Sequence, residues 1–168
     1  LLDIGGESTR PGAAAVSVGE ELARVVPVLD RLVGRVRVPV SIDTYKAEVA
    51  RIALDHGAAI VNDVSGLLYE PALAGVVAEC GAALVLMHNR GRSRDMYREA
   101  AYDEVGVEVA GELGDRIAAA IEAGVARSRI IIDPGLGFAK RAEHTFAALA
   151  ALGRLALLDR PMLVGPSR

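Results

Sequence analysis

The sequence predicts an α/β protein built on a parallel β-sheet. Strand-like apolar runs alternate with amphipathic helical stretches, and the strand runs are apolar at nearly every position. Strands of that kind are typical of parallel sheets covered by helices on their faces. Two architectures remain open, a doubly wound sheet and a (β/α)8 barrel, and the six predicted strands are two short of a barrel. They are residues 1–6, 38–44, 59–64, 83–88, 129–135 and 161–167.

A regular apolar stripe marks the clearest of the five helical stretches between these strands. Apolar residues recur there every four positions, which places them on one side of a helix and predicts that this side packs on the sheet. At the start of an earlier helix, Ser17 and Glu20 have the spacing of a capping box. The stripe consists of Val105, Val109, Leu113, Ile117 and Ile121.

Composition limits the domain organisation and the classes of partner. Apolar residues make up 52% of the chain, and no linker, low-complexity tract or charge run divides it. Residues 1–168 are therefore predicted to form a single domain around one core. The net charge of −3 and the 4% of aromatic residues argue against a nucleic-acid partner.

Cysteine content and hydropathy favour a cytoplasmic protein. No apolar run approaches the length needed to cross a membrane, and no signal peptide is recognisable. Cys80 is the one cysteine; it cannot form an intramolecular disulfide and is expected to be a core thiol. Because the chain starts inside one predicted strand and stops just after another, without an initiator Met, we interpret it as a segment of a longer protein.

Strand periodicity places several polar side chains on one face of the predicted sheet. Side chains alternate across a strand, so Asp43, Asn62 and Asp133 should share a face. Met87 falls on the same face. In a barrel these residues converge near the carboxyl ends of the strands, where the active sites of such barrels lie. The opposite, aliphatic face should contact the helices and includes Val38, Val40 and Ile42.

The polar residues on this face match one class of ligand. A carboxylate presents two acceptors, and a carboxamide presents one acceptor and two donor hydrogens. Asp43, Asn62 and Asp133 together therefore suit a planar heterocycle with adjacent N–H and amino groups, such as an aminopyrimidinone. We predict a pocket for a flat ring. The faces of that ring would be covered by Val64, Met87 and Phe138.

The stretch "GGESTRPGA", residues 5–13, predicts an anion-binding loop. Its paired glycines permit close approach of the backbone, Ser8 and Thr9 offer hydroxyls, and Arg10 offers a planar fork suited to phosphate or carboxylate. The later stretch "DPGLGFAK" does not complete a dinucleotide fingerprint, because Lys140 occupies the third glycine position. A nicotinamide site is therefore not expected.

Six motifs follow one another at the ends of the predicted strands: "DIGGESTRPGA", "VSIDT", "IVNDVSG", "LVLMH", "IIIDPGLGFAK" and "LVGPSR". In this order they resemble the strand-end motifs of the dihydropteroate synthase family, along nearly all of the chain. The resemblance implies an incomplete (β/α)8 TIM barrel, approximately strands 2 to 7 with their helices. It also implies a transferase of folate biosynthesis, which joins 4-aminobenzoate to the hydroxymethyl carbon of a dihydropterin diphosphate and releases pyrophosphate.

The same resemblance implies roles for individual residues. Arg10, Asp43 and Asp133 are the expected catalytic residues. The implied cofactor is Mg2+ and the implied assembly is a cytoplasmic homodimer. No metal ligand is expected within this segment, because the family's magnesium-linked Asn lies outside it; the family's Arg-x-His anion motif lies outside it as well. The expected pterin contacts are Asp43, Asn62, Val64, Met87, Asp133, Phe138 and Gly165, and the expected diphosphate and 4-aminobenzoate contacts are Thr9, Arg10, Pro11 and Phe138.

The implied reaction passes through a cation-like transition state. Diphosphate leaves a carbon beside the electron-rich pterin, and the neutral aromatic amine then captures that carbon. Arg10 would stabilise the leaving group, while the buried carboxylates would hold the ring and favour positive charge on it. No covalent intermediate with the protein is needed.

Structural roles compete with these functional assignments. Asp43 precedes a helical stretch and would serve as a helix cap, and Asp133 precedes Pro134 and would serve as a turn residue. Asp63 points to the other face of its strand and is expected to be structural. His88 is also expected to be structural, because it has no metal-ligand spacing.

Two other functions remain open. A pterin-binding module that presents methyltetrahydrofolate to a corrinoid partner would use a similar barrel. A catalytically inactive paralogue of the synthase would keep the same motifs. The loop at residues 5–13 favours the synthase over the module.

Overall fold

The computed structural model describes residues 1–10, 12–92, 97–98 and 100–165. Within them, five parallel strands form one sheet in the order β1-β2-β3-β4-β5, so strands that are adjacent in the chain are neighbours in the sheet. This consecutive order favours the barrel architecture, because a doubly wound sheet reverses its order at a switch point. The strands are β1 (Leu2–Gly5), β2 (Val40–Asp43), β3 (Ile60–Asp63), β4 (Ala83–Met87) and β5 (Ile130–Asp133).

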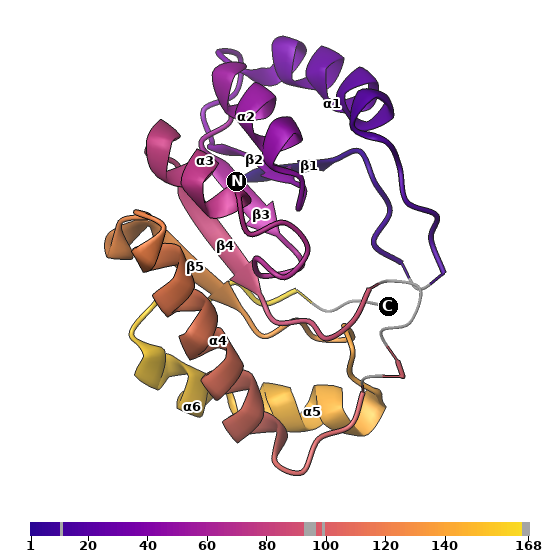
Figure 1. The fold of residues 1–168 in the computed structure, drawn as a ribbon, viewed down its shortest axis with the longest axis vertical. Coiled ribbons are helices and arrows are strands. Elements are labelled where there is room, and N and C mark those ends of the chain that lie inside the picture. The colour runs from indigo at the N-terminus through magenta and orange to yellow at the C-terminus, as the bar shows by residue number, and fades with distance from the viewer. Residues whose placement is uncertain (11, 93–96, 99, 166–168) are drawn as a thin grey trace.

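Helices connect the strands and form an outer arc around the sheet (Figure 1). The helices α1, α2 and α3 follow the half of the sheet that begins with β1, and α4, α5 and α6 lie near β5. Neighbouring helices also pack on each other, α1 on α2 and α2 on α3. The helical elements are α1 (Val18–Leu32), α2 (Ala47–Asp55), α3 (Leu73–Cys80), α4 (Val105–Glu122), η1 (Arg127–Arg129), α5 (Ala142–Ala150), α6 (Leu152–Leu155) and η2 (Ala156–Leu158).

The helix-facing side of the sheet forms the hydrophobic core. Val40 and Ile42 of β2 are buried in one cluster with apolar helix residues, as strand periodicity predicted. The same alternation buries Leu84 and Leu86 of β4. The prediction for Val38 is wrong, since this side chain is 45% exposed. β2 begins only at Val40, so Val38 lies outside the sheet whose pleat would direct it to the helices.

Local sequence signals set the start of α1 and the buried side of α4. The Ser17 hydroxyl accepts a hydrogen bond from Glu20 N, and the Glu20 carboxylate accepts one from Ser17 N, so the capping box is confirmed. The first four residues of the α4 stripe are buried, as predicted. Ile121 is 38% exposed, because it lies in the last turn of α4 and borders a surface groove shared with Leu157.

The sixth predicted strand, residues 161–167, is only a single parallel bridge in the described part of the chain. Met162 pairs with Ile132 of β5. Two hydrogen bonds flank the bridge, from Ile132 N to Pro161 O and from Leu163 N to Ile132 O. The segment therefore lies on the predicted side of β5, but two bonds do not make a strand. Residues 166 and 167 are outside the described residues.

The prediction of a core thiol at Cys80 is wrong. Cys80 is exposed at the end of α3, where Gly81 forms the C-cap and turns the chain toward β4. It borders a groove at the amino ends of the strands, together with Arg129.

The helices of the described residues include none with the length and apolar character required to span a bilayer.

Candidate active site

The sheet register brings the predicted ring-binding residues to one face. Asp43 pairs with Asn62, and Met87 pairs with Asp133. Val85, two residues before Met87, pairs with Asn62 and connects the two pairs. Paired residues of neighbouring parallel strands point to the same side of the sheet. The shared face predicted from strand periodicity is confirmed, and the ligand contacts assigned to it stay predictions.

A further acid, Asp3, lies on the same face and is not among the predicted site residues. It pairs with Ser41, two residues before Asp43, and its Oδ2 accepts a 2.9 Å hydrogen bond from Asn62 Nδ2. This bond fixes the direction of the carboxamide and leaves Asn62 Oδ1 to accept from another donor. The sequence could have indicated this position of Asp3. Asp3 lies two residues before Gly5, the start of the predicted anion loop, so both residues face the same side of the strand.

Asp43 ends β2 in a strongly acidic setting. Burial, followed by the negative charges of Asp3 and Glu21, raises its pKa to about 8. Its carboxyl group is therefore mostly protonated at neutral pH and can donate as well as accept a hydrogen bond. Asp43 does not cap the following helix, because the N-cap of α2 is Lys46, without a side-chain cap bond.

Asp133 ends β5 and is 6% exposed. Its Oδ1 accepts a 2.7 Å hydrogen bond from Gly135 N, which is the turn role that the sequence left open. No described residue donates to Oδ2, so this second oxygen remains for a ligand. Burial raises the pKa of Asp133 to about 6, whereas the bond from Gly135 and the charge of Lys140 act in the opposite direction.

Glycine is required at position 135 of the turn after β5. Gly135 has a φ of +64°, in the left-handed region, and a Cβ atom there would lie 2.0 Å from the carbonyl oxygen of His88. The His88 N–H also donates a 2.8 Å hydrogen bond to the Asp133 carbonyl. The loop of residues 134–139 is thereby seated directly on the end of β4.

The predicted ring-covering residues differ in their surroundings. Val64 and Met87 are buried, and Phe138 is partly exposed at the turn, where its N–H donates a 3.0 Å hydrogen bond to Gly135 O. Gly165 is exposed, and the space beside it is open within the described residues. The structure therefore joins Met87 to Asp133 by strand pairing, but it does not bring Gly165 against them.

The predicted anion loop starts at Gly5, which is in register with Asp43 of the ring-facing group. Arg10 is exposed, and its backbone N–H donates a 3.4 Å hydrogen bond to Ser8 Oγ. Thr9 is partly buried. Among the described residues, no hydrogen bond or ion pair connects the Arg10 side chain to Asp43. Pro11, the third predicted residue of this loop, lies outside the described residues.

A cavity of about 390 Å³ opens beside this loop. Tyr45 donates a 3.0 Å hydrogen bond to Glu7 Oε1, and the guanidinium of Arg92 lies 4.6 Å from the ring centroid of Tyr69. The lining includes none of the predicted pterin contacts, so the cavity is separate from the ring-facing group. The residues that line the cavity are Glu7, Gly12, Ala13, Ala14, Ala15, Tyr45, Tyr69 and Arg92.

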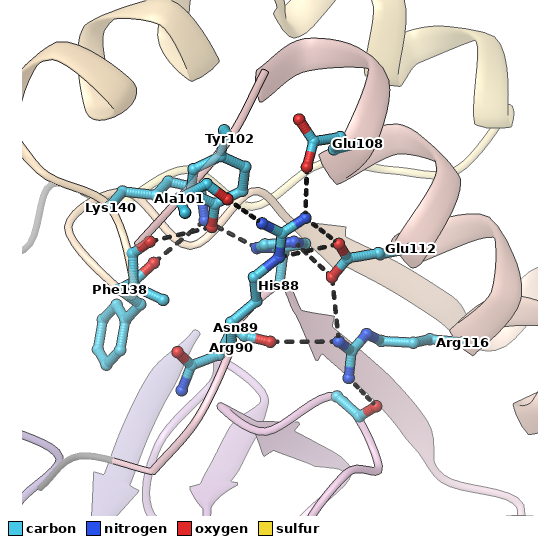
Figure 2. A network of polar contacts seen from close by, with 12 residues as sticks. His88, Asn89, Arg90, Ala101, Tyr102, Glu108, Glu112, Arg116, Phe138 and Lys140 are labelled. Carbon is cyan, nitrogen blue, oxygen red and sulfur yellow. Dashed lines mark hydrogen bonds and ion pairs between the residues drawn. The ribbon is translucent and has the colours of Figure 1, made fainter. Parts of the chain in front are cut away.

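A polar network joins the segment after β4, helix α4 and the loop after β5 (Figure 2). His88 is fully buried; its Nε2 lies 3.1 Å from Glu112 Oε2, and its Nδ1 lies 2.8 Å from Lys140 Nζ. Burial lowers the pKa of His88 to about 4, so the imidazole is neutral at pH 7. This network was not predicted, because His88 was expected only to be a structural residue without metal-ligand spacing.

Arg90 completes the network on its outer side. Its Nε donates a 2.9 Å hydrogen bond to Glu112 Oε1, and its Nη2 donates a 2.8 Å hydrogen bond to Glu108 Oε2. Burial opposes ionisation of Glu112, but hydrogen bonds from the imidazole and from Arg90 lower its pKa to about 2. The Arg90 guanidinium lies 4.0 Å from the ring centroid of Tyr102, whose hydroxyl donates to Ala139 O at 3.0 Å. The network therefore reaches the loop of the candidate site.

Asp63 has the structural role that its parity indicated. It is fully buried on the core side of β3, and its Oδ1 accepts hydrogen bonds from the backbone N–H and the hydroxyl of Ser65. Its Oδ2 accepts a 2.6 Å hydrogen bond from Leu67 N. Both oxygens are thus used to hold the turn after β3.

The described residues contain no preformed cage of protein ligands for a metal ion. Mg2+ prefers several oxygen ligands in octahedral geometry. Within the described residues, no group of three or more His, Cys, Asp or Glu side chains is placed to hold a metal ion. Mg2+ therefore remains an implication of the family resemblance, and no step below depends on it.

Consecutive parallel strands, an outer arc of helices and polar side chains at the strand ends define a ligand-binding protein of the (β/α) barrel class. The chain belongs to the family described as "Pterin binding enzyme", which matches residues 1–168.

Curated relatives and solved structures agree with this family. The dihydropteroate synthase of Synechocystis sp. is 45% identical over 100% of this chain and 58% of its own length, and that of Mycobacterium leprae is 48% identical over 100% and 59%. The structure of Xanthomonas albilineans dihydropteroate synthase with 4-aminobenzoic acid is 48% identical and has a TM-score of 0.90 over 98% of this chain and 57% of that one. A complex of the same enzyme with 7,8-dihydropteroate has a TM-score of 0.84.

These matches confirm the predicted fold class as part of a TIM barrel. The chain spans slightly under three fifths of the length of the curated relatives given above, 58% and 59%. Statements about the activity, substrates and partners of the whole protein are therefore proposals.

Proposed function

We propose that the full-length protein is a dihydropteroate synthase, which condenses a dihydropterin hydroxymethyl diphosphate with 4-aminobenzoate to give dihydropteroate and pyrophosphate. The observation that carries the proposal is the placement of Asp43, Asn62 and Asp133 on one face of the sheet. The chain around them is 45% and 48% identical to two proteins named dihydropteroate synthase.

Asn62 and Asp133 supply complementary contacts for the edge of a pterin ring. One hydrogen of Asn62 Nδ2 donates to Asp3 and orients the carboxamide, and its Oδ1 is available to accept an N–H of the ring. Asp133 Oδ2 is the acceptor for the amino group and the adjacent ring N–H, because Oδ1 is engaged by Gly135. In this arrangement Met87, paired with Asp133 in the sheet, packs against the ring.

The two acids act differently as charge develops. When diphosphate departs, positive charge spreads onto the pterin, and the buried Asp133 carboxylate stabilises it more effectively than a solvated group would. Asp43, with a pKa of about 8, begins as a neutral carboxyl group that donates to a ring acceptor. Positive charge on the ring lowers the pKa of Asp43, so this acid releases its proton to solvent as the cation forms, and the resulting carboxylate stabilises the cation.

The bond changes require positioning and charge stabilisation. The bond between the methylene carbon and the diphosphate oxygen breaks, and its electron pair leaves with the diphosphate. The lone pair of the aromatic amine forms the new C–N bond, and the resulting nitrogen loses a proton to solvent. In the proposal, the Arg10 fork binds the leaving diphosphate, Thr9 and Pro11 belong to the same loop, and Phe138 contacts 4-aminobenzoate.

Other parts of the proposal rest on the family resemblance alone. These are the use of Mg2+, assembly as a homodimer, a cytoplasmic location and the contact of Gly165 with the pterin. The relatives described above carry the synthase name, which favours the synthase over a module that presents methyltetrahydrofolate to a corrinoid protein.

The test is turnover by the full-length protein. Purified protein is incubated with the dihydropterin diphosphate, 4-aminobenzoate and Mg2+, and dihydropteroate and pyrophosphate are measured together. Equal amounts of the two products, formed only when both substrates are present, are expected. Absence of both products from a folded protein that binds methyltetrahydrofolate and a corrinoid protein would overturn the proposal in favour of the module.

A further inference from the structure

Both lysines of this chain are buried, although the chain also contains numerous arginines. Lysine is rarely buried unless its ammonium group has partners. Lys46 meets two carboxylates, those of Glu7 and Glu21. Lys140 is 2% exposed and has a different environment, because its hydrogen-bond partners are the neutral imidazole of His88 and the carbonyl of Phe138.

The geometry around His88 fixes the role of each partner. An ammonium group can only donate, so His88 Nδ1, 2.8 Å from Lys140 Nζ, must be the acceptor. The proton of the neutral ring is then on Nε2, which donates to Glu112 Oε2 at 3.1 Å. Glu112 is held in turn by Arg90. The network, drawn in Figure 2, thereby presents Lys140 with an acceptor, which carries no charge because burial lowers the pKa of His88 to about 4.

Lys140 reaches the candidate site in two ways. Its Nζ donates a 3.2 Å hydrogen bond to the carbonyl of Phe138, inside the loop that follows Asp133. Next to it, Ala139 is buried with a φ of +47°, a costly conformation for a residue with a Cβ atom, which neighbouring contacts must maintain. The positive charge of Lys140 also lowers the pKa of Asp133. In return, the Asp133 carboxylate is the charged neighbour that most favours the ammonium form of Lys140.

We infer that Lys140 is a positioning residue of the pterin site: it holds the loop at Phe138 and keeps the buried Asp133 in its ionised form. The inference rests on the proposed function in so far as Asp133 binds a pterin. Lys140 itself touches no substrate in this scheme, because it is 2% exposed and its ammonium group is engaged by His88 and by the Phe138 carbonyl.

The charge of Lys140 shifts the pKa of Asp133 in a definite direction. Burial raises the pKa of Asp133 to about 6, and the charge of Lys140 is one of two influences that oppose the rise. Burial lowers the pKa of Lys140 to about 7. Removal of the ammonium group must therefore raise the pKa of Asp133 further, so that more of this acid is protonated near neutral pH. The groups that face Lys140 are His88 after β4, Arg90 in the following loop, Tyr102 before α4, Glu112 and Arg116 on α4, and Asp133 on β5.

The experiment compares the full-length protein with Lys140→Met, which keeps the length of the side chain and removes its charge. Affinity for a pterin that lacks diphosphate is measured by calorimetry from pH 5.5 to pH 8.5, and the Asp133 carboxyl carbon is titrated by 13C NMR. In the variant, we expect the pH below which affinity falls to move upward, with a loss of about tenfold near pH 6 and a much smaller loss at pH 8.5.

Two further variants separate charge from structure. Lys140→Gln retains a donor for the Phe138 carbonyl but carries no charge, so it should follow Lys140→Met in pH dependence. Lys46→Met removes the other buried ammonium and should leave the Asp133 titration unmoved. An equal loss of affinity at every pH, with an unchanged Asp133 midpoint, would overturn the inference and assign Lys140 a purely structural role.

The outcome does not depend on folding of the variants or on turnover. In the unmutated protein, the Asp133 carboxyl and Lys140 Cε signals should show coupled titrations, whereas independent titrations would contradict the inference. A protein that binds the pterin with this pH dependence but forms no dihydropteroate would refute the proposed function alone. If the protein forms dihydropteroate but the titration midpoint of Asp133 is the same with and without the Lys140 charge, only the inference is refuted.

Discussion

Asn62 on β3 donates a 2.9 Å hydrogen bond to Asp3 on β1, across the intervening strand β2. Asp43 lies on that intervening strand, in register with Asn62 and on the same face. The bond therefore holds an acceptor carboxylate beside a second acid. This explains why the charge of Asp3 is the second-largest cause of the raised pKa of Asp43, after burial.

The first prediction concerns that pair of acids. Asp3→Asn should lower the pKa of Asp43 below its value of about 8, because one neighbouring negative charge is removed. The new carboxamide can still accept from Asn62, so the arrangement of the face should persist. Titration of the Asp43 carboxyl carbon by 13C NMR measures the change. Glu79→Gln, at an exposed ion pair with Arg51, serves as the control; an Asp43 midpoint that is the same in Asp3→Asn would disprove the coupling.

Asp133→Asn should weaken pterin binding strongly. The substitution replaces a charged acceptor by a carboxamide whose N–H groups compete with the donors of the ring. Hydrogen bonds to charged groups contribute roughly 1.5 to 3 kcal/mol each, so the affinity should fall by at least tenfold. Calorimetry with a pterin analogue gives the magnitude, and Asn62→Ala should show a milder loss. Unchanged affinity in a folded Asp133→Asn protein would remove Asp133 from the site.

Arg10→Ala should affect a different part of the reaction. If Arg10 binds the diphosphate, the variant should turn over the diphosphate substrate poorly, yet bind a pterin without that group almost normally. Arg10→Lys should restore activity only in part, because lysine lacks the planar fork. Steady-state kinetics and calorimetry on the same preparations separate the two effects. A similar loss for both ligands would argue against this role for Arg10.

Features that depend on neighbouring residues were predictable from the sequence. The shared face of Asp43, Asn62 and Asp133 follows from the alternation along each strand, and the parallel direction of the strands follows from helical stretches too long for hairpins. Gly5, in register with Asp43, likewise places Asp3 on that face. The same alternation could therefore have predicted that Asp3 lies on this face.

Features that depend on distant packing were not predictable. His88 and Lys140 are 52 positions apart and meet only because the loop after β5 folds onto the end of β4. Their contact also depends on Glu112, whose place is set by the packing of α4. Similarly, the sequence shows that Ile121 belongs to an apolar stripe but not that the last turn of its helix lies at the surface.

The turn after β5 gives a test of stability. In Gly135→Ala, the new methyl group would collide with the carbonyl of His88, and the φ of +64° is unfavourable for alanine. We expect a loss of roughly 2 to 4 kcal/mol in the free energy of unfolding, measured by urea denaturation. Gly111→Ala is the matched control: Gly111 lies inside α4 with open space beside it, so alanine should stabilise by about 0.5 to 1 kcal/mol. Equal effects of the two substitutions would show that the turn is not constrained as described.

The last prediction concerns acid stability and His88. Burial depresses the pKa of His88 from its ordinary value of 6.5 to about 4, so the unfolded state binds a proton more readily than the folded state does. The contribution of neutral His88 is fully present above pH 6.5 and declines as the pH falls toward 4. Asp133 has the opposite sign, since its raised pKa makes the folded state gain protons. His88→Gln isolates the histidine: its stability relative to the unmutated protein should improve by up to about 1.4 kcal/mol for each pH unit between 6.5 and 4. Urea midpoints across that range provide the measurement, and His56→Gln controls for the loss of a histidine. A stability difference between His88→Gln and the unmutated protein that does not change with pH would mean that His88 is not held neutral in the fold.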